Sequence, residues 1–267
     1  MRQERLQGEH GETLTMSNGT LSIQATPAFG ATIHSLVYRG EEWLDTSFPT
    51  PGPRSWWNPW MGGIHADVQG MSLLSMHEEG CSAEFVSLTD SLGNEWSGIS
   101  LNMDIVKHDE NKGLKLDLLT LMLPGSSVLC CVTRLTNGTG LSYNHFRSNL
   151  NGFILPGESI RQGWVEIDGD LRTRCGQSGV EISSEGVIRI GSDSRSAILH
   201  MVNRHPGSSA WLYTNNQVIG FGESEWMQMA ADETVWTAPV FFAFADEALT
   251  YKELQNLVDI RFDGNGR

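Results

Sequence analysis

Residues 18–44 read NGTLSIQATPAFGATIHSLVYRGEEWL, and this stretch decides the fold. Apolar and polar residues alternate in two of its segments, TLSIQAT and ATIHSLVY, and a proline and a glycine mark the turn between them. The segment TLTM at 13–16 comes before the stretch, the turn SNG at 17–19 joins TLTM to TLSIQAT, and the polar turn RGEE follows the second segment. Alternation broken by such turns is typical of antiparallel strands with one buried face, so the stretch predicts an opening hairpin and a further strand.

The same pattern continues along the 267-residue chain, in which about fifteen short segments are separated by turns rich in Gly, Asn, Asp and Pro. One segment differs, because its apolar residues have helical spacing. This segment is residues 247–258, where one face carries Ala248, Tyr251, Leu254, Leu257 and Val258. The sequence therefore predicts an all-β fold, a large antiparallel β-sandwich of two sheets with a short C-terminal helix.

The domain organisation follows from the lack of dividing segments. No Pro/Ser-rich linker, repeat of fixed period or low-complexity tract interrupts the sequence, so residues 12–267 are predicted to form a single β-sandwich domain. Residues 1–11 are polar and are predicted to be a flexible N-terminal segment, which could equally be a linker from an upstream domain. The N-terminus lacks the apolar region of a secretory signal, and no stretch approaches the roughly 18 apolar residues of a membrane span.

The net charge indicates which partners the protein can bind, and the cysteines indicate the cellular compartment. The formal net charge is -14, from 32 acidic and 18 basic residues, and such a surface repels nucleic-acid phosphates. The four cysteines contain no CxxC pair, and they are Cys81, Cys130, Cys131 and Cys175. Cys130 and Cys131 should point to opposite faces of a strand as small buried side chains, with a disulfide or a nucleophilic role as the alternative. We therefore expect a cytoplasmic protein that binds neither nucleic acid nor membrane.

A second stretch, residues 54–67 or RSWWNPWMGGIHAD, indicates function. A sugar ring has apolar faces and a rim of hydroxyls, so a carbohydrate site needs aromatic rings together with hydrogen-bonding groups. This stretch offers both, with Trp56, Trp57 and Trp60 as a platform and Arg54, Asn58, His65 and Asp67 as a polar rim. The alternative is that the tryptophans fill the core of the sandwich.

The order of the segments resembles the galactose-mutarotase-like proteins, the aldose 1-epimerase superfamily. Three parts of the chain carry the resemblance: the opening stretch, VTRLTNGTGLSYNHFRSNLNGFILPG at 132–157, and GFGESEW at 220–226 followed by the β-rich VFFAFA. In the opening stretch the matching residues are Gly30, Ala31, Ile33, Leu36, Gly40, Trp43 and Leu44. The resemblance spans most of the chain and implies the large two-sheet sandwich of that superfamily.

The resemblance also implies an activity, the interconversion of sugar anomers by general acid–base catalysis without metal or cofactor. In this sequence it makes His145 the general acid and Glu223 the general base, while His65 helps to hold the sugar. The strand of His145 is unusually polar, which favours a site there, and Arg147 and Asn149 become candidates for sugar binding.

Either of two nearby carboxylates, Glu223 or Glu225, could be the general base, and the residues around each one guide the assignment. Glu223 and Glu225 should leave the same face of a strand about 7 Å apart. We assign Glu223 as the base because it follows Gly220 and Gly222, where small residues would let a sugar approach the backbone. Glu225 should lie at the rim as a hydrogen-bond acceptor. The alternative is that both are ordinary exposed strand residues.

Other functions remain open from the sequence. One is a non-catalytic carbohydrate-binding or accessory domain. Another is a metal-dependent oxygenase, in which His65 and Asp67 form an H-x-D unit completed by His145 or His200. The HEEG segment at 77–80 could be a solvated turn or the far wall of the site, and the acidic WVEIDGD at 164–170 is expected to be structural. Motifs of serine hydrolases, nucleotide-phosphate sites and dinucleotide sites do not occur.

Overall fold

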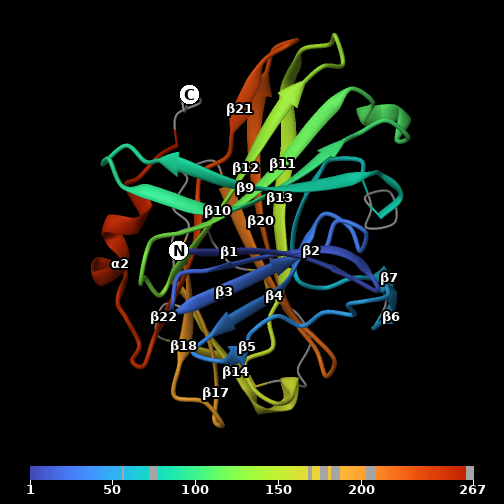
Figure 1. Cartoon of the computed structure of the whole chain (residues 1–267). Coiled ribbons are helices and arrows are strands. Elements are labelled where there is room, and N and C mark those ends of the chain that lie inside the picture. The colour runs from blue at the N-terminus through green and yellow to red at the C-terminus, as the bar shows by residue number, and fades with distance from the viewer. Residues whose placement is uncertain are drawn as a thin grey trace.

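The computed structural model describes residues 1–55, 57–71, 77–167, 170–174, 180–181, 187–202 and 208–262, and for residues 170–174, 180–181 and 208–209 the description is of the backbone. The strands form two large antiparallel sheets, here named sheet I and sheet II (Figure 1). The predicted all-β sandwich is therefore confirmed. The core lies between the sheets and collects apolar side chains from both, such as Ile23 and Phe221 of sheet I and Leu118 and Phe242 of sheet II.

Sheet I has ten strands in the described part of the chain, in the order β1-β2-β3-β4-β8-β13-β20-β19-β16, with β5 paired to β4. Their bounds are β1 (Arg2–Gly8), β2 (Gly11–Ser17), β3 (Leu21–Ala25), β4 (Thr32–Tyr38), β5 (Glu41–Glu42), β8 (Ile64–Val68), β13 (Tyr143–Phe153), β16 (Val180–Glu181), β19 (Ser208–Thr214) and β20 (Ile219–Met229). A separate two-stranded sheet consists of β6 (Gly52–Arg54) and β7 (Trp57–Trp60).

Sheet II also has ten strands among the described residues, in the order β15-β14-β17-β18-β22-β12-β11-β10-β9, with β21 paired to β12. Their bounds are β9 (Cys81–Thr89), β10 (Glu95–Asp104), β11 (Leu114–Met122), β12 (Val128–Asn137), β14 (Gly163–Ile167), β15 (Asp170–Arg174), β17 (Val187–Ser192), β18 (Ile198–Val202), β21 (Thr234–Trp236) and β22 (Val240–Ala245). Two short 3-10 helices, η1 (Asp109–Asn111) and η2 (Ile160–Gln162), lie in the connections.

The opening stretch of the sequence forms strands β3 and β4, and β2 and β3 make the expected hairpin. Leu21 pairs with Tyr38, and Ile23 pairs with Leu36, and all four side chains are buried. Directly opposite residues of an antiparallel pair share a face, so the alternation in the sequence becomes one buried face of sheet I.

The N-terminal residues differ from the expected flexible segment. Arg2–Gly8 form strand β1, which pairs with β2 along its whole length. Its side chains are almost all exposed on both faces, so no apolar alternation marks the strand in the sequence. The backbone ladder holds the strand in place, together with an exposed ion pair in which Arg5 Nη1 lies 2.9 Å from Glu12 Oε2.

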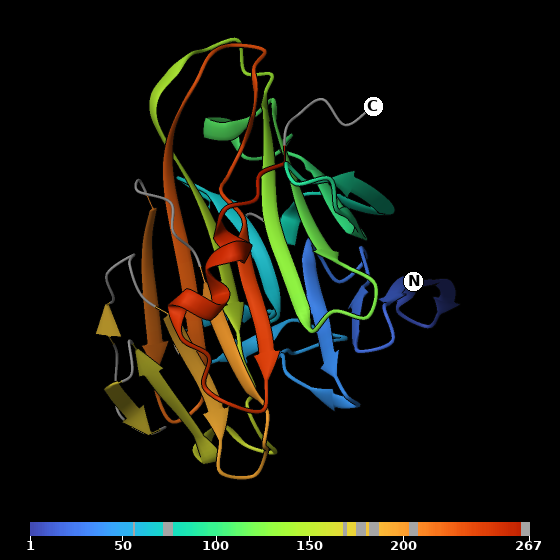
Figure 2. The ribbon, with the colours of Figure 1, turned by 90° about the vertical axis from the view of Figure 1, so that its left-hand side faces the viewer.

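The C-terminal helix α2 (Tyr251–Val258) begins four residues later than the predicted segment. Thr250 sets this start, because its hydroxyl accepts a hydrogen bond from Glu253 N while Glu253 Oε2 accepts one from Thr250 N at 2.6 Å. Leu254 packs against Cys130 and other residues on the face of sheet II turned away from sheet I. In Figure 1 the helix lies at the left margin of the molecule, and the view of Figure 2 faces it.

Cys130 and Cys131 are both fully buried and point to opposite faces of β12, as predicted. Burial raises the pKa of the Cys131 thiol to about 12, which keeps it protonated. Cys175 lies outside the described residues. None of the helices in the described ranges has the length and apolar character needed to cross a membrane.

Candidate functional site

The candidate site lies on the outer face of sheet I, the face turned away from sheet II. Leu150 of β13 is buried in the core between the sheets, so the alternating residues Asn149 and Asn151 point outward. Asn149 is opposite Asp67 of β8, and Asn151 is opposite His65. These four residues, here named the polar cluster, therefore share the outer face.

Hydrogen bonds join the polar cluster across three neighbouring strands. Asn149 Nδ2 donates to Asp67 Oδ1, and Asn151 Nδ2 donates to Asp67 Oδ2 at 2.9 Å. On the other side of β13, Ser224 Oγ of β20 donates to Asn149 Oδ1 at 2.7 Å. Asp67 is thus held by two amide donors, and its position does not depend on a flexible loop.

The burial of the polar cluster shifts the pKa of both its titratable groups. Loss of hydration raises the pKa of the Asp67 carboxyl to about 6, although the hydrogen bonds from Asn149 and Asn151 and the charge of Arg147 oppose the shift. Burial lowers the pKa of His65 to about 4, against a hydrogen bond with the Gly62 backbone. At neutral pH, His65 is therefore uncharged, and Asp67 is a carboxylate that takes up a proton just below neutrality.

Aromatic side chains lie beside the polar cluster on the same face. Trp211 and Tyr213 alternate in β19, where Trp211 is opposite Gly222 and Tyr213 is opposite Gly220. A Cβ atom at Gly222 would collide with the Trp211 indole, so the ring lies directly on the backbone of β20. Because Gly222 is also opposite Asn151, the indole is in the same cross-strand row as Asn151 and His65.

Trp57 completes this group of rings. Its indole contacts Phe153 edge-to-face, with ring centroids 5.2 Å apart, and Tyr213 with centroids 5.6 Å apart. We name Trp57, Trp211 and Tyr213, which are all half-buried, the aromatic group. Phe153 lies beneath it and is buried.

Some residues of the stretch 54–67 lie in the candidate site, and others are packed in the interior. Trp60 is 1% exposed and packs against Phe153, so it supports the aromatic group and cannot offer a surface to a ligand. His65 and Asp67 lie on the outer face of sheet I, and Trp57 of β7 lies beside that face. Asn58 is exposed, and Trp56 lies outside the described residues.

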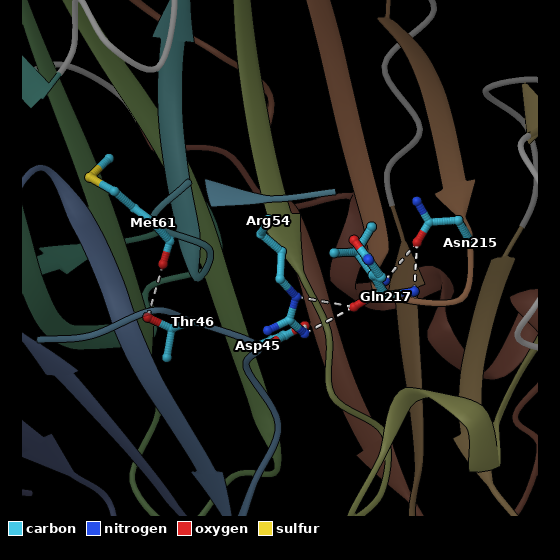
Figure 3. A network of polar contacts seen from close by, with 7 residues as sticks. Asp45, Thr46, Arg54, Met61, Asn215 and Gln217 are labelled. Carbon is cyan, nitrogen blue, oxygen red and sulfur yellow. Dashed lines mark hydrogen bonds and ion pairs between the residues drawn. The ribbon is translucent and has the colours of Figure 1, made fainter. Parts of the chain in front are cut away.

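Arg54 has a structural position. Its Nη2 atom lies 2.6 Å from Asp45 Oδ2 and donates to the carbonyl oxygen of Gln217 at 2.9 Å, while its guanidinium lies 4.8 Å from the centre of the Trp60 ring. Figure 3 shows Arg54 between Asp45 and Gln217. Asn215 Nδ2 also donates to Ser55 Oγ at 2.9 Å. Arg54 therefore ties the β6–β7 hairpin, which carries Trp57, to the turn between β19 and β20.

Arg54 and Asp45 also line an open hollow of about 600 Å³ at this end of sheet I. Burial raises the pKa of Asp45 to about 6, although the charge and the hydrogen bond of Arg54 oppose the shift. The rest of the hollow is lined by Pro53, Ser55, Leu155, residues 158–161 and residues 216–217.

His145 lies at the other end of the outer face and is exposed. Its ring stacks on Trp226 with centroids 4.0 Å apart and an interplanar angle of 9°. Trp226 is opposite Arg147, whose guanidinium lies 5.7 Å from the centre of the indole. Arg147 and His145 therefore belong to the same face as the polar cluster, nearer to the start of β13.

Glu223 and Glu225 share a face, as predicted, but it is the face turned toward sheet II. Glu223 is opposite Leu150, is 7% exposed, and lines a narrow cleft with Thr133 and Val240 of the other half of the sandwich. The cleft of about 20 Å³ holds little more than a water molecule. Glu225 Oε2 accepts a hydrogen bond from Ala238 N at 2.7 Å.

The structure therefore does not bring His145 and Glu223 together. The reason lies in the strand itself, because Phe221 enters the core between the sheets and fixes Glu223, two residues later, on the same side. Gly220 and Gly222 face outward, where the Phe153 and Trp211 rings cover them, so they do not open the backbone to a sugar next to Glu223.

Of the two histidines that could complete an H-x-D metal site, His145 lies at the other end of the outer face and His200 lies on sheet II. His65 and Asp67 lie on the outer face of sheet I, whereas His200 belongs to sheet II, with Nδ1 bonded to Ala243 O and Nε2 accepting from Leu249 N. No group of three or more His, Cys, Asp or Glu placed to hold a metal ion occurs within the described ranges. Glu79 of the HEEG segment accepts hydrogen bonds from the backbone N–H groups of residues 106–108, so it fixes a loop.

Trp211 and Tyr213 are site residues that the sequence analysis missed. The signal for them is the alternation in SAWLYT, which puts both rings on one face, combined with the alternating glycines of GFG in the next strand. Large rings on one strand facing glycines on its neighbour indicate a flat aromatic surface.

Comparison with known proteins bears on the fold. No protein-family model matches the sequence, and no curated protein sequence matches it. Solved structures do match, at low identity. A galactose mutarotase related enzyme from Lactobacillus acidophilus matches with a TM-score of 0.56 and 9% identity, over 86% of this chain and 96% of the other. A putative mutarotase from Salmonella typhimurium matches with a TM-score of 0.57 and 11% identity, over 92% of this chain and 94% of the other.

A TPR-domain containing protein from Parabacteroides distasonis matches with a TM-score of 0.60 and 10% identity, over 89% of this chain. This chain spans 48% of the length of that protein, so the fold also occurs as part of longer chains. The sheet order, the two-layer sandwich and these likenesses agree with the resemblance seen in the sequence, and the chain has the fold of the galactose mutarotase-like proteins.

Proposed function

We propose that this protein binds a carbohydrate on the outer face of sheet I. One observation carries the proposal: Trp211 of the aromatic group lies in the same cross-strand row as Asn151 and His65 of the polar cluster. A sugar ring requires an aromatic surface for its apolar face and hydrogen-bonding groups for its hydroxyls. Trp211 would supply the surface, and Asp67 and Asn151 would bind hydroxyl groups at its edge.

The arrangement is also rigid, which favours binding. Asp67, Asn149 and Asn151 of the polar cluster come from central strands and already hydrogen-bond to one another, so little conformational entropy is lost when a ligand arrives. Solved structures of this fold are described as a galactose mutarotase related enzyme, as a putative mutarotase and, over 41% of its chain, as an alpha-galactosidase, which agrees with a carbohydrate ligand.

Interconversion of sugar anomers is a second candidate, and the pKa of Asp67 favours it. A group that transfers protons works best when its pKa lies near the working pH, and burial raises the pKa of Asp67 to about 6. We propose Asp67 for this role in place of the pair His145 and Glu223, because Glu223 faces sheet II. His65, 2% exposed and uncharged at neutral pH, would lie in the floor of the site beneath the sugar.

Titration calorimetry with glucose, galactose and mannose tests the proposed binding. Asp67→Asn and Trp211→Ala are each expected to weaken binding by about tenfold, since one removes a charged acceptor and the other removes the stacking surface. The matched control is Asp117→Asn, because Asp117 also binds a neighbouring side chain, with Arg134 Nη2 at 2.7 Å, but it lies on sheet II.

Binding of none of the three sugars by the native protein, or an equal loss in the Asp117 variant, would overturn the proposal. Polarimetry on fresh α-glucose and α-galactose then separates the two candidate functions. An enzyme should speed the return to anomeric equilibrium and should lose this activity in Asp67→Asn, whereas a binding protein should leave the rate unchanged.

A further inference from the structure

We infer that the outer face of sheet I binds a neutral oligosaccharide, and that Trp226 forms a second stacking subsite at the far end of the face from Trp57. This inference rests on the proposed function, because it extends the same site along the sheet.

Trp226 is the first observation. It is 39% exposed, an unusual exposure for the largest apolar side chain, and it lies outside the aromatic group. Its cross-strand partner Arg147 is on the outer face, next along β13 from Asn149 on that face. Trp226 is therefore continuous with the polar cluster, and one ligand could touch both.

The stacking of His145 shows which side of the indole is available. The imidazole of His145 lies nearly parallel to the indole, with ring centroids 4.0 Å apart, so it covers one side of the Trp226 ring. A ligand that stacks on Trp226 would therefore use the other side of the indole.

Arg147 adds hydrogen-bond donors at this subsite. It is half-buried, its Nε atom has no hydrogen-bond partner among the described residues, and its guanidinium lies 5.7 Å from the indole centre. A guanidinium beside an aromatic ring can donate to the hydroxyls of a sugar stacked on that ring.

The length of the face decides between one sugar and several. Phe153, beneath Trp57, lies six residues after Arg147 in β13, a distance of about 20 Å at the rise of a strand. This distance is several times the width of one pyranose ring. A single sugar could therefore occupy one end only, whereas a chain of linked sugars could contact the aromatic group, the polar cluster and Trp226 together.

The charge of the protein favours a neutral chain. With a formal net charge of -14, the protein would repel a polyanionic glycan at long range. On the face itself, the charges of Asp67 and Arg147 offset one another, so the face offers no net attraction to an anionic glycan.

Calorimetric titration of a length series tests the inference, from glucose to linear β-1,4-linked and α-1,4-linked glucose oligomers and β-1,4-linked mannose oligomers. Affinity of the native protein for at least one series should rise with chain length. Trp226→Ala should lower the affinity for the longer oligomers of that series by about tenfold and leave the monosaccharide affinity unchanged. Trp226→Phe should restore part of the loss, because a smaller ring still stacks.

The matched control is Trp236→Ala. Trp236 is also half-buried and has an arginine, Arg134, 5.5 Å from its ring centre, but it lies on sheet II. Affinity that does not change with chain length, or an equal effect of the two alanine variants, overturns the inference and leaves monosaccharide binding intact. Failure of the native protein to bind any sugar of the series overturns the proposed function as well. Melting curves of both variants show whether the fold is kept.

Discussion

Glu223 and Ser224 are neighbours in β20 and point to opposite faces of sheet I. Ser224 Oγ donates to Asn149 Oδ1 on the outer face, and Glu223 lines the narrow cleft toward sheet II. Glu223→Gln should therefore leave sugar affinity within about twofold of the native value, because Gln keeps the shape of a side chain that no ligand on the outer face can touch. Calorimetry of this variant beside Asp67→Asn measures the difference. Loss of binding or turnover in Glu223→Gln, with Asp67→Asn unaffected, would place the site on the other face.

The contact between Gly222 and Trp211 predicts a second result. A Cβ at position 222 would meet the indole, so Gly222→Ala should displace the ring, destabilise the protein by about 1–3 kcal/mol and weaken sugar binding. Gly80→Ala is the control, because a Cβ there has no neighbour within 4 Å. That substitution should be neutral or stabilising by about 0.4–1 kcal/mol. Urea denaturation measures both, and similar values for the two variants would contradict the position of Trp211.

Much of the fold could be predicted from the sequence because strand alternation is a local property. The alternation in residues 21–38 gives the buried faces of β3 and β4, and the adjacent cysteines 130 and 131 give opposite faces of β12. The prediction of where α2 starts was less accurate, because the capping residue Thr250 sets the start and the apolar pattern does not.

The candidate site was harder to predict because alternation does not say which set of residues faces the core. In β20 one set is Gly220, Gly222 and Ser224, and the other contains Phe221 and Glu223. The neighbouring strands determine which set faces the core, because the rings of β13 and β19 cover the glycines on the outer face. The same limit applies to Trp57 and Trp60, whose burial depends on Phe153, a residue far along the chain.

The Asp45–Arg54 pair predicts a pH-dependent effect on stability. Arg54→Ala leaves the Asp45 carboxyl buried without its cation, which should cost on the order of 2 kcal/mol, given that Arg54 itself is 35% exposed. The loss should be smaller at pH 5 than at pH 8, because the unpaired Asp45 can then take up a proton. The double variant with Asp45→Asn should be more stable than the sum of the single effects predicts, as a double-mutant cycle by urea denaturation would show. Additive effects would contradict a direct pair.

Asp67 predicts a second pH dependence. Burial is the main cause of its raised pKa, as it is for Asp45, but no ion pair to the Asp67 carboxyl occurs among the described residues. Burial raises its folded-state pKa to about 6 from the usual 3.8, so the folded protein holds the proton more strongly than the unfolded chain. The contribution of Asp67 to stability is therefore fully present below about pH 4 and is lost as the pH rises through 6, by on the order of 2 kcal/mol.

Comparison of the native protein with Asp67→Asn isolates this contribution. His65 and His34, whose pKa values burial lowers to about 4, reduce stability as the pH falls from 6.5, but they are present in both proteins and cancel in the difference. The stability of Asp67→Asn relative to the native protein should therefore increase between pH 4 and pH 7, as measured by urea denaturation at several pH values. A difference that stays constant would mean that Asp67 remains ionised over this range, and the case for Asp67 as a proton-transfer group would then be lost.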